Sequence, residues 1–166
     1  TLFKNDIGER LLMIQKPIFS PQTEWLPPES FPDLSKHDEI AIDLETKDPG
    51  LKTMGSGSVT GRGKIVGVAL AVDNWSGYYP IAHEGGGNMD EKIVMDYFRT
   101  VLNLPARKIF HNAMYDVCFI RAAGLKINGE IVDTMIAGSL VDENRFRYDL
   151  GSMGRDYLGR GKNEAV

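Results

Sequence analysis

Two acidic residues, Asp43 and Glu45, are separated by one residue near the end of an apolar stretch. Apolar and other residues alternate over 39–45, which is the period of a β-strand, so both carboxylates share one face and Leu44 takes the other. Adjacent carboxylates repel each other, and their hard oxygen atoms suit Mg²⁺ or Mn²⁺. The pair therefore indicates a divalent metal site, with two solvated acids on an exposed strand as the alternative.

A third carboxylate, Asp116, lies within an apolar segment of helical periodicity. Phe119 and Ile120 follow it at helical spacing, which places Asp116 on the core-facing side. A buried aspartate is costly unless it is paired or bound to a metal. Asn112 precedes it by one turn on the same face, with Tyr115 beside it. The alternative is that Asn112 only caps the helix and Asp116 is solvated at the helix edge.

The remaining chemically interesting residues give weaker signals. His83 ends a predicted strand, and a single histidine there is either structural or a neighbour of a site. His37, His111 and Cys118 do not have the spacing of a zinc site. The glycine-rich segment 55–64 departs from both the P-loop pattern and G-x-G-x-x-G, and we interpret it as part of a mobile loop.

These residues are carried by alternating strand and helix patterns. The segments 39–45, 64–72 and 78–83 read as strands, and the short turn at 73–77 predicts an antiparallel meander. A loop is expected at 46–63. Further strands are expected at 108–111 and 130–134, and helices at 90–103 (with Asp90 as its cap), 112–124, 135–142 and 148–159. The order predicts a mixed α/β fold.

Length and composition limit the organisation of the chain. The 166 residues fit one domain, with 42% hydrophobic and 25% charged residues, which excludes a disordered class. Residues 1–38, rich in proline, are expected to form an irregular arm that packs on the domain at 39–166. A single cysteine, no signal peptide and no apolar run of about 20 residues favour a reducing, intracellular setting such as the cytoplasm.

Charge is unevenly distributed along the chain. The net charge is −4, with 5 Lys/Arg against 10 Asp/Glu in residues 1–50 and 14 against 13 in residues 51–166. Five basic and two acidic side chains lie between 145 and 162, a local balance of +3. This basic strip is either a solvated helix face or a place for phosphates.

The ordered set of Asp43-x-Glu45 followed by Asp116 resembles the 3′–5′ proofreading exonuclease domain of family A (polymerase I type) DNA polymerases. That domain belongs to the DEDD ribonuclease-H-like exonuclease superfamily. The matching segments are AIDLET (41–46), YYPIAHE (78–84), HNAMYDVCFI (111–120), DTMIAGSLVDEN (133–144) and YDLGSMGRDYLG (148–159). The resemblance covers about residues 38–160.

The resemblance implies a ribonuclease-H-like mixed sheet with three antiparallel strands followed by parallel ones, flanked by helices. It implies two Mg²⁺ or Mn²⁺ ions held by Asp43, Glu45 and Asp116, and release of nucleoside 5′-monophosphates from the 3′ end of single-stranded DNA. The residues that it places near the terminal nucleotides are Leu44, Thr46, Leu51, His83, Asn112 and Tyr115. It also implies a polymerase domain in the same, longer chain, in a bacterial or phage-infected cell.

The sequence departs from this family after residue 160. The third motif, which supplies a Tyr or His and a fourth carboxylate, is absent: Tyr148 and Asp156 have the wrong spacing. We therefore expect a domain that is incomplete at its C-terminal end and impaired in activity as it stands, because the fourth carboxylate is missing. Two other interpretations remain open, a free-standing DEDD exonuclease that processes RNA and a non-catalytic ribonuclease-H-like module that binds nucleic acid.

Overall fold

The computed structural model describes residues 26–160 of the 166-residue chain. A five-stranded sheet with the order β3-β2-β1-β4-β5 forms its centre. The strands are β1 (Glu39–Lys47), β2 (Lys64–Val72), β3 (Trp75–Pro80), β4 (Arg107–Phe110) and β5 (Ile131–Asp133). The helices are α2 (Leu51–Met54), α3 (Gly57–Thr60), α4 (Glu91–Asn103), α5 (Ala113–Ala122), α6 (Thr134–Val141) and α7 (Leu150–Leu158).

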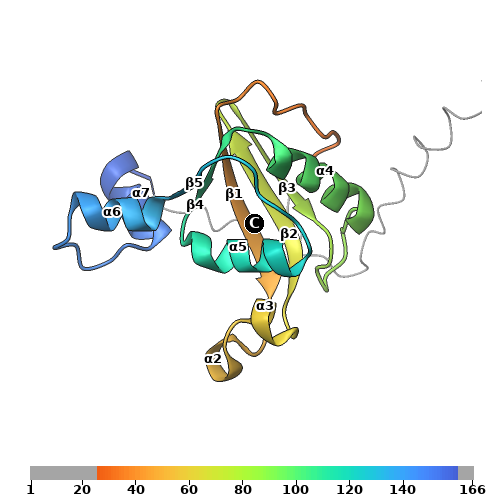
Figure 1. Cartoon of the computed structure of the whole chain (residues 1–166), viewed down its shortest axis with the longest axis horizontal. Coiled ribbons are helices and arrows are strands. Elements are labelled where there is room, and N and C mark those ends of the chain that lie inside the picture. The colour runs from red at the N-terminus through yellow and green to blue at the C-terminus, as the bar shows by residue number, and fades with distance from the viewer. Residues whose placement is uncertain (1–25, 161–166) are drawn as a thin grey trace, which may run out of the picture.

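The strands pair as the sequence predicts. β1 pairs antiparallel with β2 and β2 with β3, whereas β4 runs parallel to both β1 and β5. Helices α4 and α5 lie on one face of the sheet, and α6 and α7 project to the side beyond β5 (Figure 1). Among the helices between residues 26 and 160, none combines the length and the hydropathy that a bilayer crossing requires.

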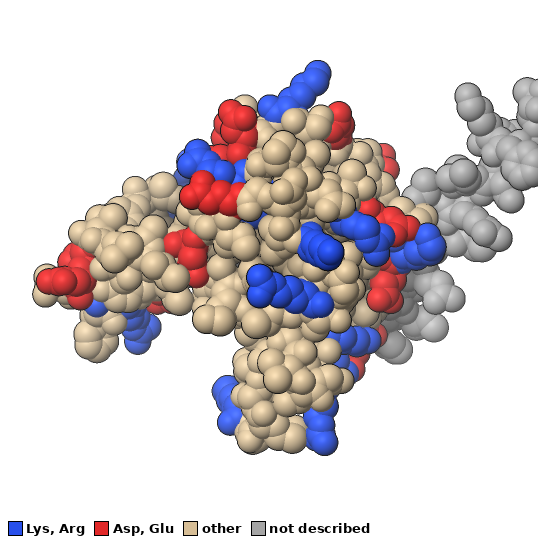
Figure 2. Space-filling view, in the orientation of Figure 1, with Lys and Arg blue, Asp and Glu red and all other residues tan. Residues whose placement is uncertain are grey.

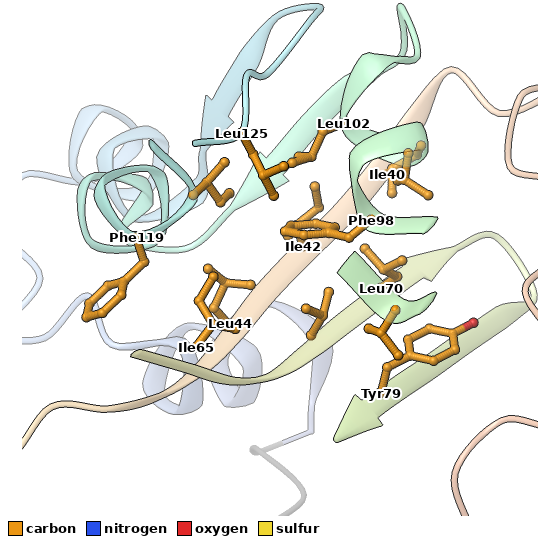
Figure 3. Close-up of a cluster of buried hydrophobic side chains, with 14 of the residues drawn as sticks. Ile40, Ile42, Leu44, Ile65, Leu70, Tyr79, Phe98, Leu102, Phe119 and Leu125 are labelled. Atoms are coloured by element: carbon orange, nitrogen blue, oxygen red, sulfur yellow. The ribbon is translucent and has the colours of Figure 1, made fainter. Parts of the chain in front are cut away.

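The hydrophobic core lies between the sheet and helices α4 and α5. Ile40, Ile42 and Leu44 project from β1 into this core, where Phe98 of α4 and Phe119 of α5 meet them (Figure 3). The alternation along β1 thus turns every second side chain into the core and leaves Ala41, Asp43 and Glu45 exposed on the opposite face. Hydrophobic burial on one face fixes the register, and with it the face that carries the acids.

Several predicted boundaries are confirmed and others are wrong. β2 spans 64–72 as predicted, and Asp90 caps α4 by accepting a hydrogen bond from Ile93 N at 3.0 Å. The turn is confined to residues 73 and 74, because Asn74 adopts a left-handed φ of 65° and Trp75 already pairs with Val72. β3 consequently begins earlier than predicted and ends at Pro80, three residues before His83.

The predicted loop at 46–63 contains two single-turn helices, α2 and α3. Ser56 caps α3, and the Asp48 carboxylate accepts a hydrogen bond from Gly57 N at 2.8 Å. Gly63 donates to Gly57 O at 3.2 Å and closes the segment on itself. The prediction of a loop throughout 46–63 is therefore wrong at these two helices, which local caps and one carboxylate hold in place.

Part of the N-terminal arm lies on the core. Phe31 stacks on Tyr79 with ring centroids 5.2 Å apart, and Leu34 is buried. The hydroxyl of Tyr97 in α4 donates to Pro32 O at 2.9 Å. These contacts tie residues 31–34 of the predicted arm at 1–38 to β3 and α4, whereas residues 1–25 of that arm lie outside the described residues.

One lysine is fully buried within the fold. The Lys108 side chain in β4 is 0% exposed, and its ammonium group donates to Leu104 O at 2.5 Å, Ala106 O at 2.8 Å and Asn128 O at 2.8 Å. Burial lowers the pKa of Lys108 below its ordinary value. The ammonium group therefore connects the segment after α4 with the segment before β5.

We expect Lys108→Met to lower the free energy of unfolding by about 2–4 kcal/mol, because one buried and two part-buried carbonyl groups lose a charged donor. Urea denaturation followed by circular dichroism measures the change. Lys126→Met, which alters an exposed lysine, serves as the matched control and should stay within about 0.5 kcal/mol of the parent chain. Equal effects of the two substitutions would show that the three hydrogen bonds contribute nothing net.

Candidate active site

Asp43 and Glu45 lie on the face of β1 that points away from the core. Asp43 pairs with Ala69 of β2, and Glu45 pairs with Gly67. A β-bulge follows, because Thr46 pairs with Ile65 and leaves Val66 as an extra residue in β2. The two acids thus face a strip of very small side chains, which leaves their carboxylates accessible.

Asp116 reaches the same strand from α5. The parallel pairing of β1 with β4 is confined to 39–41, and beyond it the Leu44 N–H donates to Asp116 Oδ1 at 3.0 Å. The Asp116 carboxylate therefore accepts the hydrogen bond that a neighbouring strand would otherwise accept from β1. Asp116 is only 4% exposed, which agrees with the core-facing position predicted from its helical spacing.

The electrostatics of the site are unfavourable without a cation. Burial, opposed by the hydrogen bond from the Leu44 N–H and reinforced by the negative charge of Asp43, raises the pKa of Asp116 to about 6. The Asp43 charge therefore acts on a second carboxylate that has little access to water. A divalent cation between them would relieve both the repulsion and the cost of burial.

The donor set of the site suits a hard divalent ion. Carboxylate oxygens are the ligands that Mg²⁺ and Mn²⁺ prefer. Among the residues that the structure describes, no three His, Cys, Asp or Glu side chains converge closely enough to hold an ion as they stand. Asp43 and Asp116 thus offer a charged pair, and Glu45 would complete a set of three by turning its side chain along the exposed face.

Next to the acids, a second group of polar side chains joins β1 to α5. The Thr46 and Tyr115 hydroxyls are 2.7 Å apart, and the Tyr115 hydroxyl donates to Asp48 Oδ2 at 3.4 Å. Asp48 Oδ1 is buried without a hydrogen-bond partner in the described structure. Leu51, at the start of α2, is 44% exposed. These residues border the acids at the end of β1.

Asn112 adopts an unusual backbone conformation. Its φ of 65° and ψ of 52° are left-handed, and its side chain makes no cap hydrogen bond to α5, so its interpretation as an ordinary helix cap is wrong. The turn is held instead by the Asp133 carboxylate, which accepts hydrogen bonds from Asn112 N at 3.0 Å and Ala113 N at 2.8 Å. Asp133 also caps α6 through Met135 N at 2.9 Å.

Asp133 is a residue that sequence reasoning missed. Burial alone would raise the pKa of Asp133. Backbone N–H groups at the starts of α5 and α6 stabilise its charged form, however, and hold the pKa below its ordinary value. Its only sequence signal was its place at the end of a short predicted strand. Asp133 fixes the start of the helix that carries Tyr115 and Asp116.

Two histidines lie beside the acids. The His83 ring contacts the Tyr78 hydroxyl through Nε2, and its main chain is bound by Asn88. Thr134 donates its hydroxyl to Phe110 O, so its oxygen accepts the proton of His111 Nδ1 at 2.9 Å. His111 Nε2 is then an acceptor that is buried without a partner among the described residues.

A cavity of about 850 Å³ lies against the exposed sheet face and reaches Asp43 and His111. Its floor is made of small side chains that include Ala41, Ala69 and Ala71. Such a floor allows a helix or a base to approach the sheet closely.

One predicted site residue is corrected, and one residue of the basic strip has defined partners. The Leu44 side chain is 6% exposed and lies in the core, so only its main chain faces the site, which corrects its place among residues expected to touch a nucleotide. In the basic strip, Arg145 is paired with Asp156 at 2.7 Å and lies over the Tyr157 ring. On the face covered by α4 and α5, acidic and basic side chains are interspersed (Figure 2).

Residues 19–165 match the protein family described as 3′–5′ exonuclease. A DNA-directed DNA polymerase of Pseudomonas phage M6 is 31% identical over 163 residues, which are 92% of this chain and 24% of that protein. DNA polymerase DpoZ of Salmonella phage PMBT28 is 28% identical over 130 residues, which are 77% of this chain and 18% of that protein. The chain therefore spans about a quarter or less of these relatives.

Solved structures share the fold. NrnC of Brucella melitensis with bound Mg²⁺ has a TM-score of 0.58 and 21% identity, over 80% of this chain and 59% of that one. Escherichia coli RNase D, an exoribonuclease involved in structured RNA processing, has a TM-score of 0.56 and 14% identity, over 78% and 30%. The POL domain of Pol1 from M. smegmatis, in complex with DNA primer-template and dNTP, has a TM-score of 0.57 and 18% identity, over 80% and 21%. These similarities confirm the predicted ribonuclease-H-like fold.

We expect Asp116→Asn to stabilise the metal-free chain at pH 8 and to have little effect at pH 4. The raised pKa of about 6 means that the folded state binds the Asp116 proton more tightly than the unfolded state does. The stability associated with the protonated group is therefore present below about pH 4 and lost as pH rises through about 6, by roughly 2–3 kcal/mol. Asparagine keeps the acceptor for Leu44 N without the charge.

Urea denaturation in EDTA at a series of pH values measures this difference between the two chains. If the difference in free energy of unfolding between Asp116→Asn and the parent chain stays constant from pH 4 to pH 8, the buried charge is not destabilising.

Proposed function

The chain belongs to the 3′–5′ exonuclease family, and from that membership we propose that it removes nucleotides from the 3′ end of single-stranded DNA as the proofreading domain of a DNA polymerase. The observation that supports this most directly is the position of Asp116, whose carboxylate is bound to the main chain of β1 beside Asp43. The sequence relatives named as DNA polymerases favour DNA over RNA as the substrate.

Asp43, Glu45 and Asp116 would hold two Mg²⁺ or Mn²⁺ ions. Such ions supply a water of lowered pKa and stabilise the leaving 3′ oxygen of a phosphodiester. Asp43 would contribute to this site together with Asp116, because the Asp116 carboxylate is bound to Leu44 N next to Asp43 and the Asp43 charge acts on it. Without cations the three carboxylates would repel the phosphate.

The residues beside the acids are suited to a splayed 3′ end. Thr46 and Tyr115 present joined hydroxyl groups, Leu51 presents an exposed apolar side chain, and the Asn112 amide is left unused by the helix. We place the terminal sugar and base against these four side chains, with His83 at the edge. Bases must be unpaired to enter such a site, which favours single-stranded ends.

The site also needs the third family motif. We propose that a segment after residue 160 of a longer chain brings the fourth carboxylate and packs over the exposed sheet face. Two features support this. The small side chains Ala41, Ala69 and Ala71 offer a floor for close packing, and His111 Nε2, buried without a partner among the described residues, offers a hydrogen-bond acceptor. A polymerase domain in the same chain is in keeping with the length of the phage relatives.

We expect Asp43→Ala to reduce degradation of 3′-labelled single-stranded DNA by about 100-fold or more in the longest natural chain that carries these residues. EDTA should reduce degradation by the parent chain to the same extent, and added Mg²⁺ or Mn²⁺ should restore the rate of degradation. Asp73→Ala removes an exposed acid from the β2–β3 turn and serves as the control. Equal rates for Asp43→Ala and the parent chain would exclude the exonuclease, and faster digestion of an RNA of the same sequence would favour the RNA-processing alternative.

We expect Asn112→Gly to leave stability unchanged within about 0.5 kcal/mol and to lower the rate of digestion at least about tenfold. Glycine adopts the left-handed conformation freely, and the Asn112 side chain makes no cap hydrogen bond that the fold would lose. Thermal unfolding and single-turnover digestion separate the two effects. Full activity of Asn112→Gly would show that the amide does not touch the substrate.

A further inference from the structure

Tyr78 is the aromatic residue of β3 that lies on the same sheet face as the acids. The strand register places Asp43 opposite Ala69 and Ala69 opposite Tyr78, so these three residues form one row across β1, β2 and β3. Side chains in such a row point to the same side of a sheet. Tyr78 is therefore two strands away from Asp43 on the exposed face, with only an alanine between them.

The Tyr78 ring leans diagonally from this row over Gly67. A Cβ atom at Gly67 would lie 2.6 Å from Tyr78 Cε2 and closer still to the hydroxyl oxygen, so only glycine leaves room for the phenol. Gly67 is the register partner of Glu45. Because opposed Cβ positions are about 5 Å apart, the phenol hydroxyl lies within reach of the Glu45 carboxylate.

His83 holds the phenol in this slot. Its Nε2 atom hydrogen-bonds the Tyr78 hydroxyl, and the two rings meet edge to face with centroids 5.8 Å apart. The His83 main chain is itself fixed, because Asn88 Oδ1 accepts from His83 N at 2.7 Å and Asn88 Nδ2 donates to His83 O at 2.8 Å.

The β-bulge anchors the same segment. The carbonyl of Val66, the extra residue of the bulge, accepts hydrogen bonds from Ile81 N at 2.9 Å and Ala82 N at 3.1 Å. The segment that leads to His83 is thus attached directly beside Gly67. The bulge, the glycine and the Asn88 clamp together give the phenol one defined position.

Two other tyrosines, Tyr79 of β3 and Tyr97 of α4, have ordinary structural contacts. Tyr79 donates to Ser30 O at 3.1 Å and Tyr97 to Pro32 O at 2.9 Å, both in the arm beside the core. The Tyr78 phenol differs because its surroundings are charged: burial raises the pKa of Tyr78, and the charges of Glu45 and Asp43 raise it further. Its hydroxyl therefore stays protonated, and with His83 Nε2–H as the donor in their contact, the phenol proton is available to a carboxylate.

We propose that Tyr78, fixed by His83 and admitted by Gly67, is a positioning residue that orients the Glu45 carboxylate toward Asp43 and so strengthens divalent-ion binding. This inference rests on the proposed metal-dependent function. Glu45 must turn along the exposed face to join Asp43 and Asp116, and a phenol donor beside it would favour one orientation of the carboxylate. Loss of such an outer hydrogen bond typically weakens metal affinity by 10- to 100-fold.

The test measures the dissociation constant of Mn²⁺ by electron paramagnetic resonance of the free ion, which requires no catalytic activity. Tyr78→Phe should weaken Mn²⁺ binding at least about tenfold. Tyr97→Phe, which removes a phenol hydroxyl beside the core, should leave the constant within twofold. Gly67→Ala keeps every donor but displaces the ring, so it should reproduce the effect of Tyr78→Phe, whereas Gly85→Ala, with open space around it, should not.

The double variant Gly67→Ala with Tyr78→Phe should bind Mn²⁺ no more weakly than either single variant, because both changes act through one hydroxyl. Additive losses, or a Tyr78→Phe constant within twofold of the parent chain, would overturn the inference while leaving the metal site intact. Equal Mn²⁺ constants for the parent chain and Asp43→Ala would instead overturn the proposed metal site itself. Circular dichroism confirms that each variant is folded.

Discussion

The site depends on the hydrogen bond from the Leu44 N–H to the Asp116 carboxylate. Strand β1 loses its parallel neighbour after Ala41, and an unpaired N–H inside the sheet would cost about 1–3 kcal/mol. Asp116 satisfies this donor from α5 and in doing so brings a buried carboxylate next to Asp43. The same contact that completes the sheet therefore creates the charge repulsion that a divalent cation would relieve.

The surrounding residues hold the two partners of this bond in place. Asp133 binds the backbone N–H groups at the start of α5, which sets the position of Asp116 on its helix. On the other side, alternate burial of Ile40, Ile42 and Leu44 fixes the register of β1. The left-handed Asn112 then turns the chain sharply from β4 into α5. The positions of the acidic side chains are therefore set by residues at the ends of helices and strands as well as by the hydrophobic core.

The sequence was sufficient for features set by local periodicity. The alternation at 39–45 predicted the face of Asp43 and Glu45, and helical spacing predicted the burial of Asp116. The ordering of 46–63 was missed, because it depends on Asp48 binding Gly57 N across the segment. The roles of Asp133 and Tyr78 were missed for the same reason, since each acts through partners that only the folded sheet brings together.

We propose that Asp43 and Asp116 share a divalent ion beside the exposed face of the sheet. Anomalous diffraction at the manganese edge, from crystals of this chain soaked in Mn²⁺, would locate that ion. We predict a peak within coordination distance of both carboxylates, about 2.2 Å from their oxygens. A well-ordered site with no peak at saturating Mn²⁺, or a peak bound only by other residues, would contradict the account.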